Sequence, residues 1–142
     1  MTLEQEEPGN TFSEIVVDHA TNPRNVGSIP DADAYASVLG PCSDNMEVWL
    51  KVRDGHIKEI TFWTDGCDAT IACGSLATEL ARGKTLGEAL AISAEVITTN
   101  LCGLPKDHIH CAGLASLTLK KAVIEYMNLQ REPWKKAYRK GG

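Results

Sequence analysis

Alternation of apolar and polar residues predicts a small β-sheet in the first half of the chain. The segment MEVWLKVR places apolar side chains at every second position, as in a half-buried strand: Met46, Val48, Leu50 and Val52. The Asp54-Gly55 pair that follows is a strong hairpin signal, so HIKEITFWT is expected to return as the partner strand. The upstream segment YASVLG reads as a further short strand. Three antiparallel strands are therefore predicted.

Helical periodicity surrounds these strands. The segment 12–22 carries one apolar stripe and is stopped by Pro23: Phe12, Ile15, Val16 and His19. A second helix is expected over 67–83, with Gly83 as its stop, and short helices from Thr85 and Ser93. A long last helix is expected from about Cys111 to Gln130. The fold class is α+β: a three-stranded antiparallel sheet covered by helices, with an N-terminal helix and a long C-terminal helix.

Length and composition indicate one soluble globular domain. The 142 residues divide into a flexible N-terminal tail (1–11), a single domain (12–130) and a basic C-terminal tail (131–142). A net charge of -5 argues against binding to nucleic acid, which needs clustered cations. No apolar run reaches the length of a membrane span, and the acidic N-terminus does not resemble a targeting signal, so a cytoplasmic protein is expected.

The five cysteines are odd in number and scattered, which does not indicate a disulfide framework. Three of them lie at the ends of predicted elements, where ligand sites are usually built. Cys42 shares a turn with Asp44, Cys67 stands where the third strand meets a helix, and His110-Cys111 stands where a loop meets the last helix. Cys73 and Cys102 look like packed residues, because free cysteine is usually buried. His19, His56 and His108 are interpreted as surface or packing residues.

Three thiols, a carboxylate and an imidazole form a chemically mixed set of ligands. Zinc accepts all three donor types, whereas stable iron–sulfur clusters usually take four thiolates. A carboxylate is a harder ligand than a fourth thiolate, so a cluster on this set should be easier to lose. Helix starts beside Cys67 and Cys111 would also favour thiolate over thiol. The pattern favours a protein that hands its cluster on.

The chain resembles the iron–sulfur cluster assembly scaffolds of the IscU family, also found as the N-terminal domain of NifU. The resemblance runs from about residue 12 to 130 and rests on four segments: NPRNVGSI, GPCSDNMEVWLKV, GCDATIACGSLATELARGKTLGEAL and LPKDHIHCAGLA. It implies a non-enzymatic scaffold that is a sulfur acceptor. The implied fold is an antiparallel sheet with helices on one face.

The resemblance also implies the site. The cluster ligands would be Cys42, Cys67 and Cys111, with Asp44 and His110 completing or modulating the site. Cys111 matches the position that receives persulfide sulfur from a cysteine desulfurase. The cargo would be a [2Fe–2S] cluster, or [4Fe–4S] in a dimer, and zinc could occupy the same site. Apo iron–sulfur proteins or carriers would be the recipients, and both a monomer and a homodimer fit.

Two departures from the family pattern stand out. Ser43 replaces the glycine of the family's CGD segment. The LPPVK loop, which a dedicated Hsp70-type chaperone reads in the family, is LPKDH here (104–108). A charge replaces its central apolar residue, which argues against that partnership.

Two other classes of function remain open from the sequence. One is a zinc-dependent sulfurtransferase, in which zinc would hold and release the accepting thiolate. The other is a hydrolase that pairs Cys111 with His110. Adjacent residues at a helix start rarely point at each other, so the hydrolase is the weaker reading.

Overall fold

The sheet has the predicted strands and order. The computed structural model describes residues 12–41 and 44–131. Strands β1 (Ala34–Leu39), β2 (Asn45–Arg53) and β3 (His56–Thr64) form one antiparallel sheet in the order β1-β2-β3. Asp54 and Gly55 between β2 and β3 have φ of 55° and 76°, the positive values that a tight hairpin turn requires. The three-stranded antiparallel prediction is confirmed.

The helices follow the predicted order with shifted ends. They are α1 (Glu14–Thr21), α2 (Asp68–Ala81), α3 (Leu86–Leu90), α4 (Ala94–Asn100) and α5 (Ile109–Arg131), with a 3-10 turn, η2 (Lys106–His108), before α5. Hydroxyl side chains cap three of the helix starts: Ser13, Thr85 and Ser93. Gly83 follows α2 with φ of 84°, as expected for a helix stop.

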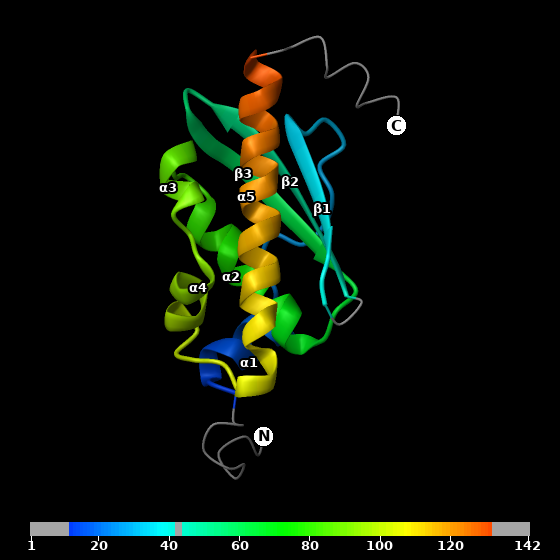
Figure 1. Cartoon of the computed structure of the whole chain (residues 1–142), viewed down its shortest axis with the longest axis vertical. Helices are drawn as coiled ribbons and strands as arrows, with labels where there is room; N and C mark the ends of the chain where they lie inside the picture. Colours follow the sequence, from blue (N-terminus) through cyan, green and yellow to red (C-terminus); the bar gives the residue numbers. More distant parts are fainter. Residues whose placement is uncertain (1–11, 42–43, 132–142) are drawn as a thin grey trace.

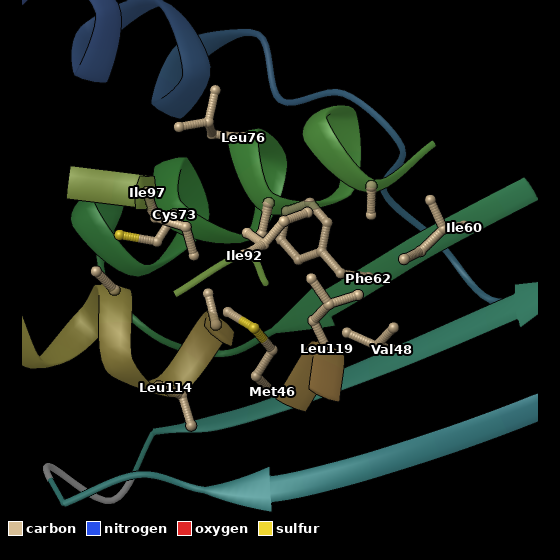
Figure 2. Packing of buried hydrophobic residues seen from close by; sticks show 14 of the residues in the cluster. Met46, Val48, Ile60, Phe62, Cys73, Leu76, Ile92, Ile97, Leu114 and Leu119 are labelled. Carbon is tan, nitrogen blue, oxygen red and sulfur yellow. The ribbon is translucent and has the colours of Figure 1, made fainter. Parts of the chain in front are cut away.

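The helices cover one face of the sheet (Figure 1). α5 runs along β1 and β2, and α2 packs beside it on β3. The core lies between these layers, where Met46 of β2 and Phe62 of β3 meet Leu119 of α5 (Figure 2). A Cβ added to Gly74 of α2 would lie 2.5 Å from the Phe62 ring, so glycine allows the close approach of helix and strand.

The start of the last helix differs from the prediction. α5 begins at Ile109, two residues before Cys111, because η2 leads directly into it. The turn begins at Pro105, whose carbonyl accepts a hydrogen bond from the His108 N–H at 2.8 Å. His110 and Cys111 therefore belong to the first turn of the helix and not to the preceding loop.

The predicted terminal tails are largely outside this description. The predicted tails at 1–11 and 131–142 lie outside the described residues, except for Arg131, which is the last residue of α5. Across residues 12–41 and 44–131, no helix combines the length and apolar character that crossing a membrane requires.

Candidate metal centre

Two cysteines and a histidine from separate segments converge at one end of the sheet. Cys67 is the N-cap of α2, His108 ends η2, and Cys111 lies in the first turn of α5. Their two sulfur atoms and one ring nitrogen all lie within 4.8 Å of one another. The Cys67 Sγ to His108 Nδ1 distance is 4.0 Å. Two thiolates and an imidazole are soft donors that suit zinc or iron.

The hydroxyl of Thr70 joins this group to Asp44. Thr70 is fully buried in the first turn of α2, and its Oγ1 lies 3.3 Å from Cys111 Sγ and 3.2 Å from Asp44 Oδ2. The same oxygen lies 3.7 Å from Cys67 Sγ. A hydroxyl has a single proton, so Thr70 can donate to the carboxylate or to the Cys111 sulfur, one at a time.

Asp44 places a carboxylate at the edge of the site. Its side chain is buried, and Oδ1 has no hydrogen-bond partner among the described residues. A buried carboxylate oxygen without a partner is costly unless water or a cation satisfies it. Asp44 lines an open pocket of about 390 Å³. The other residues around this pocket are Asp65, Gly66, Cys67, Thr70, Asp107, His108 and His110.

Comparison with known proteins identifies the family of this site. The family model described as the NifU-like N terminal domain matches residues 11–133, nearly the whole chain. The chain belongs to the NifU-like N-terminal domain family. The family predicted from the four sequence segments is thereby confirmed.

Named relatives of this NifU-like chain come from archaea, bacteria and fungi. Iron-sulfur cluster assembly scaffold protein IscU 1 of Archaeoglobus fulgidus is 47% identical over 116 residues, covering 81% of this chain and 76% of the relative. The IscU scaffold protein of Escherichia coli K12 is 42% identical over 120 residues, covering 81% of this chain and 93% of the relative.

A solved structure supports the fold. A candidate iron-sulfur cluster assembly scaffold for the SUF system from Fervidobacterium islandicum superimposes with a TM-score of 0.66 at 22% identity. The match covers 79% of this chain and 96% of the other. At that identity the likeness establishes the shared NifU-like architecture.

The NifU-like fold brings most of the predicted site residues together. Asp44, Cys67 and Cys111 meet around Thr70, and His110 Nε2 lies 3.7 Å from Cys111 Sγ. Cys42, the remaining predicted ligand, lies outside the described residues, as does Ser43. The ligand role of Cys42 stays a prediction.

The two spare cysteines of this NifU-like chain differ from each other. Cys73 is fully buried in the core, as the packing interpretation expected (Figure 2). Cys102 is exposed, with φ of 62°, in the turn after α4, so the expected packing is wrong for this residue. A left-handed turn at the end of the helix directs it outward.

Sequence reasoning did not include Thr70 and His108 in the site. Each stands three residues from a cysteine, Thr70 after Cys67 and His108 before Cys111. Side chains three apart on a helical turn share a face, and this spacing was the available signal.

Burial and hydrogen bonding give the cysteine thiols of this NifU-like chain different pKa values. Burial raises the pKa of Cys67, but hydrogen bonds from the Thr70 backbone and hydroxyl and from the Ala69 backbone outweigh it, so the pKa is lowered. Burial raises the pKa of Cys111 to about 11, although the Thr70 hydroxyl opposes this. Burial also raises the pKa of Cys73 far above its ordinary value.

The cysteines of the metal-free protein should therefore be alkylated in a fixed order. At pH 8 a thiol with a pKa of about 11 is ionised in only about one molecule in a thousand. Iodoacetamide should modify exposed Cys67 well before buried Cys111, with Cys73 slowest of the three. Peptide mass spectrometry over a time course measures the order. Faster modification of Cys111 than of Cys67 would contradict it.

Proposed function

We propose that this chain is a scaffold on which a transient iron–sulfur cluster is assembled and then transferred to apo-proteins. The observation that carries the proposal is the convergence of Cys67, His108 and Cys111, with the Asp44 carboxylate beside them, at an open pocket. The relatives named as scaffolds, from Archaeoglobus fulgidus and Escherichia coli, support it.

The donor set favours temporary binding. Thiolates hold iron tightly, whereas the Asp44 carboxylate is a harder donor and also lies against Thr70. The pocket admits solvent and a recipient's ligands next to Cys67, which is exposed. A cluster bound here would be protected on the side of α2 and α5 and open on the other.

Sulfur would arrive from a cysteine desulfurase as persulfide. The Cys111 thiolate attacks the terminal sulfur of the desulfurase persulfide, a new S–S bond forms at Cys111, and the desulfurase cysteine leaves as thiolate. Two electrons for each sulfur, from an external electron donor, then give sulfide. A thiol that coordinates a cation is held as thiolate, so iron loading should favour acceptance at buried Cys111.

The same donor chemistry bears on the type of cluster and on the competing metal. One chain offers donors for a [2Fe–2S] cluster, and a [4Fe–4S] cluster would draw on a second copy. Zinc would compete for the same thiolates and imidazole. The chaperone loop carries exposed Lys106 and Asp107 on η2, so we expect weak binding to a dedicated Hsp70-type chaperone. The recipients would be apo iron–sulfur proteins or carriers.

Anaerobic reconstitution tests the proposal. The full chain is incubated with a cysteine desulfurase, cysteine, ferrous iron and a reductant, and iron and acid-labile sulfide are measured. Equal amounts of both, followed by transfer to an apo-ferredoxin, are the expected result. Persulfide transfer that needs zinc, with no bound sulfide, would instead assign a zinc-dependent sulfurtransferase, for which two thiolates and an imidazole are also suitable donors.

A further inference from the structure

We propose that His108 is a nitrogen ligand of the divalent metal ion held between Cys67 and Cys111. The inference depends on the proposed function for the identity of the cargo, but it concerns the affinity of the metal-free chain for a single ion. The residue stands in the LPKDH segment, where this chain departs from the LPPVK pattern.

The geometry is close to that of a bound site. Tetrahedral zinc with Zn–S near 2.3 Å and Zn–N near 2.0 Å separates its ligand atoms by roughly 3.5–3.8 Å. The Nδ1 atom of His108 lies 4.0 Å from Cys67 Sγ, and all three donor atoms lie within 4.8 Å. A contraction of at most about 1.3 Å between any two donor atoms would place all three on one ion.

A backbone hydrogen bond and an aromatic contact restrict the position of the His108 ring. Its backbone N–H donates to Pro105 in η2, and its ring packs against Phe12, with centroids 5.2 Å apart and planes at 56°. Phe12 immediately precedes Ser13, whose hydroxyl donates to the Leu101 carbonyl. Restricting the ring in this way reduces the entropy cost of ligation.

His110, the other histidine near Cys111, lies in a different position from His108. Its Nε2 lies 3.7 Å from the sulfur of its neighbour Cys111. Within the described part of the chain, the three-donor group contains His108 and not His110. The geometry therefore assigns the imidazole ligand to His108 and leaves His110 beside the Cys111 sulfur.

A packing role for His108 is the competing interpretation, since its ring contacts Phe12. The variant His108→Phe separates the two roles, because phenylalanine keeps an aromatic ring against Phe12 and has no ligating nitrogen. His108→Cys supplies a different soft donor at the same place. His56→Phe is the matched control, because His56 is an exposed histidine in the β2–β3 hairpin.

The experiment is anaerobic titration of the full metal-free chain with Co²⁺, followed by absorbance. His108→Phe should weaken Co²⁺ binding by about tenfold or more, as removal of a ligating or orienting group commonly does. His108→Cys should recover affinity and strengthen the sulfur-to-cobalt charge-transfer band. His56→Phe should bind Co²⁺ as wild type does, and His110→Ala should weaken Co²⁺ binding less than His108→Phe does. Thermal melts of the metal-free variants verify folding.

Two outcomes would overturn the assignment. Wild-type Co²⁺ affinity in His108→Phe would leave His108 a packing residue only. Loss of affinity in His110→Ala, with His108→Phe intact, would transfer the ligand role to His110. Either result could occur while the wild-type chain still assembles and transfers a cluster, whereas failure of wild-type reconstitution would defeat the scaffold function itself.

Discussion

Replacement of Cys111 by serine should abolish cluster assembly while leaving the domain folded. Cys111 is the buried sulfur that contacts both Thr70 and His110, and it lies within 4.8 Å of the other soft donors. Serine keeps the size and a hydroxyl but removes the sulfur that would bind iron and accept persulfide sulfur. Acid-labile sulfide after anaerobic reconstitution should fall to less than about a tenth of wild type, since thiolates dominate cluster ligation.

The spare cysteines supply the controls. Cys73→Ala and Cys102→Ser should retain near wild-type iron and sulfide, because Cys73 lies in the core and Cys102 is exposed in the turn after α4. Mass spectrometry after desulfurase treatment should find the added sulfur on Cys111 in both controls. If the Cys111→Ser variant still accumulates persulfide at the wild-type level, another cysteine accepts the sulfur.

Removal of the Asp44 carboxylate should give the opposite behaviour: a cluster that lasts longer and is handed over more slowly. Asp44 is buried beside Thr70, with one carboxylate oxygen lacking a partner among the described residues. A carboxylate that competes with thiolates for iron and attracts water would ease release. In Asp44→Ala, cluster absorbance in air should decay several-fold more slowly, and transfer to an apo-ferredoxin should slow as well.

Two variants identify the cause of any change. Asp44→Asn keeps an oxygen that can accept the Thr70 hydrogen bond and removes the charge, so it should behave like Asp44→Ala if charge is what matters. Asp65→Asn is the matched control, because Asp65 lines the same pocket but is exposed. If Asp44 is only a turn residue, its loss costs about 1 kcal/mol of stability, the scale of one hydrogen bond. Faster decay with normal transfer would then be observed.

The fold was predictable because its signals are local. Alternation in β2 and the Asp54-Gly55 turn define the hairpin without reference to the rest of the chain. Hydroxyl N-caps at Thr85 and Ser93 likewise marked the two short helices. The start of α5 was placed two residues late, because a 3-10 turn continuing into an α-helix gives little signal at the junction.

The site was predictable only in part. Cysteines at element ends indicated that Cys67 and Cys111 would meet, and the structure places them together. The roles of Thr70 and His108 depend on how the starts of α2 and α5 are set against each other. That relation is tertiary: it follows from packing of both helices on the sheet and not from the residues next to either cysteine.

The distribution of the donors along the chain links cargo binding to synthesis and turnover. Asp44 comes before β2, Cys67 follows β3, and His108 and Cys111 arrive only at the last helix. A chain emerging from the ribosome thus exposes its first thiols well before their partners exist, and α5 must dock before an ion has a place to bind. On the proposed function, bound iron would stabilise only the completed domain, by the mass-action gain of any ligand that prefers the folded state. A domain without iron would lack that stabilisation and would open more often, so cells short of iron would hold less of this protein.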